Sequence, residues 1–449
     1  MQEMKDIVSN HIDCNKYNFR TLNYLGSKLR LLDFIEENIL HVTGRNLGVC
    51  DLFAGTGCVS YRLSQNYPIY TCDIQEYSEV ICNALLGEHK VPQPLVETVL
   101  NAASSNLAHT VLGAFEPLIQ KEECSIKDCN LEVLSAVIEN GSVEVFTLEP
   151  KPSVIEKELL STYSNLKRNG LLDKKTLISR YYGGVYFSYR QAVYIDIFLE
   201  TIEKNVPAKY KDLFLAALLS TASDLANTVG KHFAQPLKAR DSQGHIKKTV
   251  YNKALANKTV HVVSLYEKWL RKYIDLPQSN FKNVVFKGDY LDCLRSLPDS
   301  VKTVYADPPY TRDHYSRFYH VLETMTLRDN PTLSTVTIHG EVHVSNGIYR
   351  SDRYQSPFCI KSQAPAAFRE MFELVSASKR NLLLSYSPYD ITKKSHPRVV
   401  TLEQLSTMAK EYFNHVEIVS AGHFSHNKLN SSEHFLEASD EAEVLVVCQ

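Results

Sequence analysis

The chain has 449 residues, of which 44% are hydrophobic and 22% are charged, and its formal net charge is −2. These values are ordinary for a globular protein, and no stretch approaches the roughly 18 consecutive apolar residues that a membrane-spanning helix needs. The start of the sequence also lacks the basic and then apolar profile of a signal peptide, so we expect a soluble, cytoplasmic protein with no membrane partner.

The first element with a chemical signature is a predicted strand, glycine-rich loop and helix in NLGVCDLFAGTGCVSYRLSQ, residues 46–65. Gly55 and Gly57 let the backbone come close to a ligand, and the helix that follows directs unpaired amides into the loop. An ordinary tight turn is the alternative. The loop lacks the third glycine of the dinucleotide pattern, where Ser60 stands, and it lacks the GxxxxGK[ST] pattern of a triphosphate site. A nucleoside without a pyrophosphate is favoured, and S-adenosylmethionine fits that description.

A second short strand is predicted in YPIYTCDIQEYS, residues 67–78, and it ends at Asp73. In nucleotide sites an acid about 20 residues beyond the glycine loop hydrogen-bonds the ribose hydroxyls. We therefore expect Asp73 to hold a ribose. A helix N-cap or a turn residue is the alternative.

A long helical region follows, with helical apolar spacing in YKDLFLAALLSTASDLANTV, residues 210–229. From Lys231 to Lys272 the chain holds ten Lys and Arg residues against only Asp241 and Glu267. A solvated helix face would explain this charge, but Gly and Ser between the cations are typical of a loop that follows a phosphate backbone. The candidate phosphate contacts are Lys231, Lys238, Arg240, Lys247 and Lys248.

A third strand is predicted at residues 301–306, directly before DPPY at residues 307–310. Neither Pro308 nor Pro309 can donate to a sheet ladder, so the strand ends there. Open α/β sheets build their sites at the carboxyl ends of strands, which places Asp307 at such a site. A plain turn is the alternative.

The chain length limits the possible number of domains, and the cysteine pattern limits the possible disulfides and metal sites. A chain this long predicts one large domain with a substantial insertion, or two domains. Its ten cysteines include no CxxC pair, and Cys124 and Cys129 lack a second pair at zinc-like spacing. We expect free thiols and no bound metal.

Six motifs occur in a fixed order: YLGSKLRLLDFI (24–35), DLFAGTG (51–57), Asp73, FKGDYLDCL (286–294), DPPY (307–310) and NLLLSYS (381–387). With them the chain resembles the Dam-type, alpha-group, N6-adenine-specific DNA methyltransferases. The resemblance implies an α/β, Rossmann-like, S-adenosylmethionine-dependent methyltransferase fold, with a mixed seven-stranded sheet and flanking helices. It implies a catalytic domain in residues 1–87 and 280–449, interrupted by a mainly helical DNA-recognition domain in residues 88–279.

The same resemblance implies an activity, which is site-specific methyl transfer to the 6-amino group of an adenine flipped out of double-stranded DNA. The run DPPYTRDHYSRFYHVLET is similar to one in methylases of restriction-modification systems, so a cognate endonuclease encoded separately is an expected partner. The alternatives are N4-cytosine methylation, an RNA or protein-glutamine substrate, and a non-catalytic methylase-like DNA-recognition subunit. Asp rather than Ser or Asn at position 307 favours adenine.

The expected catalytic residues follow from the chemistry of the amine. An adenine amine is a poor nucleophile because its lone pair is delocalised into the ring. The Asp307 carboxylate and the Pro308 carbonyl would accept its two hydrogens, with Pro309 completing the turn and Tyr310 stacking on the base. Tyr315, Phe318 and Tyr319 would close the pocket or, alternatively, belong to the core.

The expected binding residues follow from position in similar enzymes. Lys28 would lie near the reacting centre, and Asp289 would accept from the adenine amine of the cofactor unless it is only a helix cap. Arg350 and Arg353, in GIYRSDRYQSPFC (347–359), would cover the flipped nucleotide, with solvated surface as the alternative. The cofactor set is Tyr24, Lys28, Asp51, Phe53, Ala54, Gly55, Thr56, Gly57, Asp73, Ile74, Asp289 and Tyr290.

Overall fold

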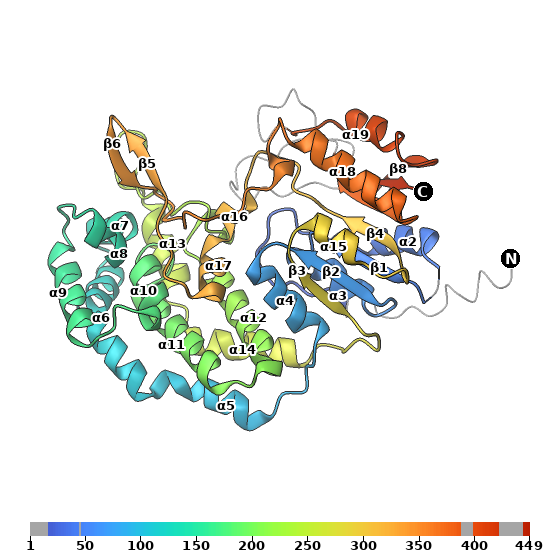
Figure 1. Cartoon of the computed structure of the whole chain (residues 1–449). Helices are drawn as coiled ribbons and strands as arrows, with labels where there is room; N and C mark the ends of the chain where they lie inside the picture. The colour runs from blue at the N-terminus through green and yellow to red at the C-terminus, as the bar shows by residue number, and fades with distance from the viewer. Residues whose placement is uncertain (1–16, 45, 388–397, 422–442) are drawn as a thin grey trace.

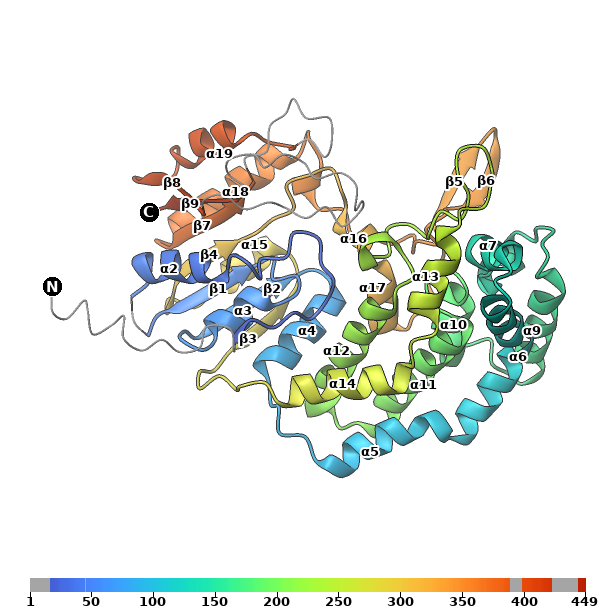
Figure 2. The same cartoon turned by 180° about the vertical axis from the view of Figure 1, so that it is seen from behind.

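The structure, a computed structural model, describes residues 17–44, 46–387, 398–421 and 443–449. One half of the molecule is built on a seven-stranded sheet of order β3-β2-β1-β4-β7-β9-β8 (Figure 1, Figure 2). Strand β9 pairs antiparallel with β7 and β8, and the other pairings are parallel. The predicted mixed seven-stranded methyltransferase fold is confirmed. The strands are β1 (Gly48–Leu52), β2 (Ile69–Asp73), β3 (Val284–Lys287), β4 (Val301–Ala306), β7 (Asn381–Tyr386), β8 (Val416–Ser420) and β9 (Val444–Cys448).

The central strands end together, and their ends define one edge of the sheet. Leu52 at the end of β1 pairs with Cys72 of β2 on one side and with Ala306 of β4 on the other. Because these strands are parallel, Asp73 and Asp307 come to the same edge as the loop after β1. The strand ends predicted from the sequence at Asp73 and before DPPY agree with the structure.

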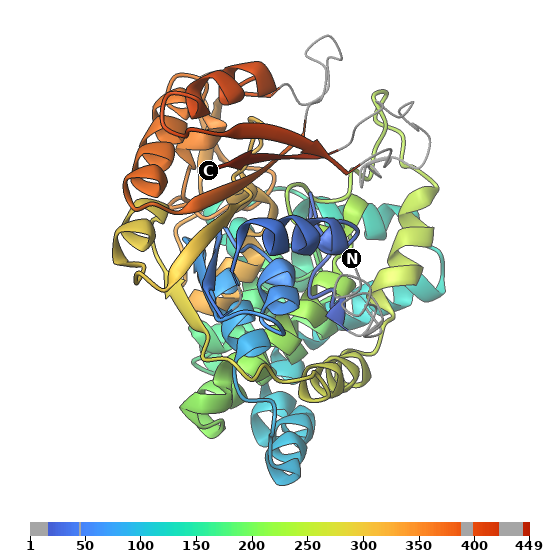
Figure 3. The ribbon, with the colours of Figure 1, turned by 90° about the vertical axis from the view of Figure 1, so that its right-hand side faces the viewer.

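Helices cover both faces of this sheet, as Figure 3 shows. Tyr305 and Leu383 pack on the face that α2 and α3 cover, whereas Val304 and Leu382 pack on the face under α15, α18 and α19. Side chains alternate between the faces, and both faces are buried, so these strands are apolar on both sides. The helices are α2 (Leu32–Val42), α3 (Cys58–Leu63), α15 (Tyr290–Ser296), α18 (Ala364–Ala377) and α19 (Leu402–Ala409).

The other half of the molecule consists of helices α5 to α14, which the chain forms between α4 (Glu76–Leu86) and β3. They lie inside the predicted insertion, and its helical character agrees with the sequence. None of the described helices combines the length and apolar composition needed to cross a lipid bilayer. The helices are α5 (Gln93–Asn101), α6 (Asn106–Lys127), α7 (Leu131–Asn140), α8 (Val143–Leu148), α9 (Glu156–Arg168), α10 (Leu177–Tyr182), α11 (Tyr189–Asn205), α12 (Ala208–Leu225), α13 (Thr249–Lys258) and α14 (Val262–Ile274).

The division between the two halves differs from the boundary expected at residue 280. Helices α16 (Tyr315–Phe318) and α17 (His320–Leu327) follow DPPY in the chain, yet α17 lies against α4, α10 and α12. One continuous core contains side chains of α4, α12 and α17. The halves share this core because the apolar faces of α4 and α17 are buried by helices of the insertion rather than by the sheet alone.

A two-stranded hairpin also follows DPPY, formed by β5 (Thr335–Ile338) and β6 (Glu341–Val344), and it extends from the helical half (Figure 1, Figure 2). Its base is held by the buried Tyr186, whose hydroxyl lies 3.0 Å from the carbonyl oxygen of Gly347 and 2.9 Å from that of Phe233. The segment after DPPY therefore contacts the helical half at two places, first through α17 and then at the base of the hairpin.

Candidate active site

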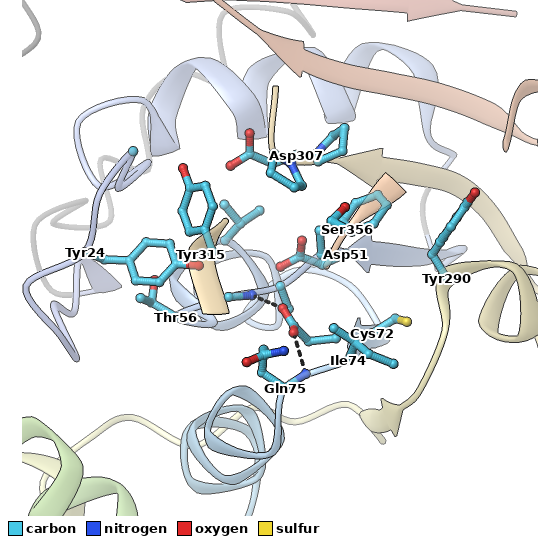
Figure 4. Close-up of a pocket in the computed structure, with 18 of the residues that line it drawn as sticks. Tyr24, Asp51, Thr56, Cys72, Ile74, Gln75, Tyr290, Asp307, Tyr315 and Ser356 are labelled. Carbon is cyan, nitrogen blue, oxygen red and sulfur yellow. Dashed lines mark hydrogen bonds between the residues drawn. The ribbon is translucent and has the colours of Figure 1, made fainter. Parts of the chain in front are cut away.

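A cleft of about 1070 Å³ opens at the carboxyl edge of the sheet (Figure 4). Gly57 and Tyr310 are absent from its lining, but most of the residues expected at the site form its walls. These are Tyr24, Lys28, Asp51, Phe53, Ala54, Gly55, Thr56, Asp73, Ile74, Asp289, Tyr290, Asp307, Pro308 and Pro309.

The glycine loop is held in shape by Asp73. Its carboxylate accepts a hydrogen bond from the amide of Gly55 and another from the amide of Gln75, each at 2.9 Å (dashed in Figure 4). Gly55 has a φ of +54°, and a Cβ atom there would lie 3.0 Å from the hydroxyl oxygen of Tyr24. The backbone therefore requires glycine at this position. A ribose contact by Asp73 stays a prediction.

Asp51 lies at the base of the cleft and is 1% exposed. Its carboxylate accepts a hydrogen bond of 2.5 Å from the Ser60 hydroxyl. Burial raises the pKa of Asp51 to about 7 in spite of this bond. A cationic ligand group beside it would favour the charged form of the carboxylate.

The start of α15 forms the wall on the far side of the loop. Asp289 caps this helix, because its Oδ1 accepts from the amide of Leu291 at 2.9 Å, and the same residue lines the cleft. Asp289 is therefore a helix cap, as the alternative predicts, and it also remains a residue of the site. Tyr290 packs against Phe53 and Phe358, with ring centroids 5.5 and 5.1 Å apart. These rings give the cleft an apolar wall suited to a planar base.

Asp307 belongs to a buried ion triad. The ammonium of Lys28 lies 2.8 Å from Oδ2 of Asp307 and 3.3 Å from Oε1 of Glu443. Burial raises the pKa of Asp307 to about 6, with Lys28 acting against that shift and Glu443 adding to it. Burial alone would lower the pKa of Lys28, but the two carboxylates outweigh it and raise that pKa above its ordinary value. With all three groups ionised, the triad carries one net negative charge beside the cleft.

Glu443 is a functional candidate that the sequence reasoning missed. It is 1% exposed, and its Oε1 accepts from the Ser385 hydroxyl at 2.8 Å. Strand β9 begins at the next residue and pairs with β7, which places Glu443 beside Ser385. The sequence signal that could have identified Glu443 is its position directly before the apolar run VLVVC.

The aromatic residues expected around the pocket take different places. Tyr315 lines the cleft near Asp307 and Tyr24 (Figure 4). Tyr319 is a core residue that stacks on Tyr24, with ring centroids 4.6 Å apart, and Phe318 is buried in the same core. Tyr319 and Phe318 therefore belong to the core, whereas Tyr315 lines the pocket.

Tyr310 lies beside the cleft rather than in its wall. Its ring packs 5.3 Å from the ring of Tyr386, and the guanidinium carbon of Arg398 is 4.6 Å from its centroid. Stacking on a flipped base stays a prediction, and it requires the ring face turned away from Arg398.

Two of the cations expected to contact DNA serve the fold instead. Arg350 is 2% exposed and pairs with Asp329 and Asp352. The ammonium of Lys231 donates to Asn257 Oδ1 and to a main-chain carbonyl of α12, and burial lowers its pKa to about 8. To reach a phosphate, Lys231 would have to abandon the buried Asn257, and Arg350 would have to abandon two carboxylates. Neither side chain is therefore expected to contact DNA.

The other expected cations are more accessible. Lys238, Arg240 and Lys248 are exposed, and Lys247 and Arg353 are half-buried. Arg240 forms an ion pair of 3.2 Å with Glu139, which an exposed pair can exchange for another anion at little cost. These five cations stay candidates for phosphate contacts.

Comparison with known proteins agrees with this geometry. Residues 24–111 match the family model described as D12 class N6 adenine-specific DNA methyltransferase. The chain resembles that family, as the motifs predict. It is 22% identical over 373 residues to the type II methyltransferase M.FokI of Planomicrobium okeanokoites, an alignment that covers 82% of this chain and 44% of the relative.

Two further relatives have similar names. The chain is 24% identical to the modification methylase LlaI of Lactococcus lactis subsp. lactis, over 87% of this chain and 49% of the relative. It is 23% identical to the type II methyltransferase M.NlaIII of Neisseria lactamica, over 82% and 83% of the two chains. The chain thus spans about half the length of the first two relatives. The names of all three support the predicted enzyme class.

Proposed function

We propose that this protein is a site-specific DNA methyltransferase that transfers the methyl group of S-adenosylmethionine to the 6-amino group of a flipped-out adenine. The observation that carries the proposal is the Asp307 carboxylate, held by Lys28 at the edge of the cleft that the glycine loop and Asp73 form. The family match to residues 24–111 supports adenine in DNA as the substrate. The relatives' names support a modification enzyme of a restriction-modification or related defence system.

The cleft residues fit S-adenosylmethionine. Three carboxylates line the cleft at separate places, those of Asp51, Asp73 and Asp289, and they match the cofactor's ammonium, ribose hydroxyls and adenine amine. The apolar wall of Phe53 and Tyr290 suits the adenine ring. When bound there, the cofactor supplies an electrophilic sulfonium methyl group.

Asp307 and Pro308 act on the target amine. Lys28 binds one oxygen of Asp307 and so fixes the orientation of the carboxylate. The carboxylate and the Pro308 carbonyl accept the two amine hydrogens, which localises the nitrogen lone pair toward the incoming methyl. As the new N–C bond forms, the sulfonium–methyl bond would break and leave a neutral thioether. The amine nitrogen would become cationic, and Asp307 would accept its proton.

Methyl transfer to DNA tests the proposal directly. Duplex DNA incubated with the protein and S-adenosylmethionine labelled in the methyl group should contain labelled 6-methyladenine after digestion to nucleosides. Sequencing for modified adenines should then reveal one recurring site. Label found instead in N4-methylcytosine, RNA or protein would assign a different substrate, and no label in any of them would contradict the proposal.

Replacing Glu443 by glutamine should reduce kcat and move the acidic limb of the pH profile to lower pH. Glu443 raises the pKa of Asp307, so removing its charge lowers that pKa. Lys28 would then pair with Asp307 alone, and the carboxylate would become a weaker acceptor for the amine. We expect kcat to fall roughly tenfold, in line with a weakened general-base contact.

The matching controls are Glu443→Asp and Glu417→Gln. Aspartate keeps the charge, so the acidic limb should return toward its wild-type position. Glu417 is exposed on β8, and the same substitution there should change neither kcat nor the profile. A lower kcat with an unmoved acidic limb in Glu443→Gln would mean that Glu443 only supports the fold.

A further inference from the structure

Unpartnered polar atoms gather in and beside the wall of the cleft, in the turn at the start of α16. Within the described ranges, Nδ1 of His314, Oγ of Ser316 and Nε of Arg317 are buried and have no hydrogen-bond partner. They belong to one turn of the chain, and His314 and Ser316 line the cleft. Buried polar atoms are nearly always paired, so three such atoms in one turn indicate a polar ligand from outside the chain.

Two arginines adjoin this turn and share one aromatic platform. The guanidinium carbons of Arg317 and Arg353 lie 5.2 and 4.7 Å from the ring centroid of Tyr349. Tyr349 is 7% exposed, and its hydroxyl donates to the carbonyl of Ala234, so the platform is fixed to the helical half. Arg353 directly precedes Tyr354, which lines the cleft. Both cations thus stand between the cleft and the helical half.

These two arginines lack the carboxylate partners of their neighbour Arg350. In the part of the chain that the structure describes, no carboxylate oxygen lies within 4.0 Å of either, whereas Arg350 pairs with Asp329 at 2.6 Å. Burial and the charge of Arg317 lower the pKa of Arg353, and burial with both arginines lowers the pKa of His314. Half-buried like charges repel, and an anion between them would relieve the repulsion.

We propose that Arg317 and Arg353, together with His314 and Ser316, bind one phosphodiester group of the DNA strand beside the flipped nucleotide. The inference rests on the proposed function, since a base in the cleft must be continuous with a backbone at its mouth. Planar guanidinium groups match the geometry of phosphate oxygens, which favours arginine at this place. The methionine carboxylate of the cofactor is the other oxyanion that these groups could accept, and the experiment separates the two.

Arg317→Gln and Arg353→Gln test the proposal by DNA binding. The Kd for a fluorescent duplex should rise about tenfold for each variant, as expected for one lost charge-assisted contact. Over 50–200 mM salt, the slope of log K against log [salt] should become shallower by about 1. The Kd for S-adenosylmethionine should stay unchanged. The melting temperature should also stay unchanged, because each substitution removes one of the two arginine charges that repel each other. Arg369→Gln, an exposed arginine on α18, should alter none of these values.

Each other outcome has a definite meaning. Weaker cofactor binding with unchanged DNA binding would assign the site to the cofactor carboxylate and overturn the phosphate assignment. Unchanged affinity for both would show that no oxyanion binds there. Wild-type protein that binds DNA with the expected salt dependence but methylates no adenine would contradict the proposed function and leave the phosphate site standing.

Discussion

Asp307→Ala should abolish methyl transfer while leaving the affinity for S-adenosylmethionine nearly unchanged. The variant keeps the glycine loop, Asp73 and Asp289, which line the part of the cleft proposed to bind the cofactor. It removes the acceptor that directs the amine lone pair and takes the proton. We expect kcat to fall about 10²- to 10³-fold, since losing one preorganised polar contact to the reacting group commonly has an effect of that size. Single-turnover transfer of labelled methyl measures the loss, and calorimetric titration measures the cofactor Kd.

The control and the pH dependence sharpen this result. Asp292→Ala removes an exposed carboxylate on α15 and should retain full activity. In the wild-type protein, Asp307 must be charged to accept from the amine, and its pKa is raised to about 6 by burial. The rate should therefore be constant above that pH and fall about tenfold per pH unit below it. Activity that persists unchanged at pH 5, or in Asp307→Ala, would contradict the assigned role.

Asp73→Ala should raise the Kd for S-adenosylmethionine about 100-fold. The Asp73 carboxylate receives the amides of Gly55 and Gln75, and both would lose their acceptor. Two charge-assisted hydrogen bonds, each contributing about 1.5 kcal/mol or more, hold the glycine loop and the turn before α4 in their binding shapes. A ribose contact would add to the loss. Titration calorimetry of the purified variant measures the Kd.

Two variants separate the loop effect from general damage. Asp73→Asn retains one acceptor oxygen and should give an intermediate Kd. Asp128→Ala removes an exposed carboxylate at the end of α6 and should bind the cofactor normally. If Asp73→Ala bound the cofactor with wild-type affinity, neither the shape of the loop nor a ribose contact would depend on this residue.

Local patterns were sufficient to locate much of the site. Gly55, Asp73 and Asp307 each follow or terminate a short apolar run, and the structure brings all three to one cleft. This follows because a buried parallel strand ends where a polar or proline-containing turn begins, and parallel strand ends share one edge of the sheet. Asp289 was likewise found by its position after an apolar run, with the helix cap as the alternative.

Contacts between distant segments were beyond the sequence. Lys231 and Arg350 carry the same charge as Lys238 and Arg353. Only their hydrogen-bond and ion-pair partners in the folded chain distinguish them. The orphan atoms of His314 and Arg317 are likewise visible only once the turn is packed.

The sequence by itself determined the glycine loop and the DPPY turn, because each depends on residues a few positions apart, and the order of its motifs indicated the fold class through a family resemblance. Only the tertiary structure decided that Glu443 shares Lys28 with Asp307, and that α17 belongs to the core of the helical half. The physical reason is that these contacts depend on the order of the strands in the sheet. The antiparallel placement of β9 beside β7 brings Glu443 close to Lys28, and no local periodicity encodes which distant strands pair.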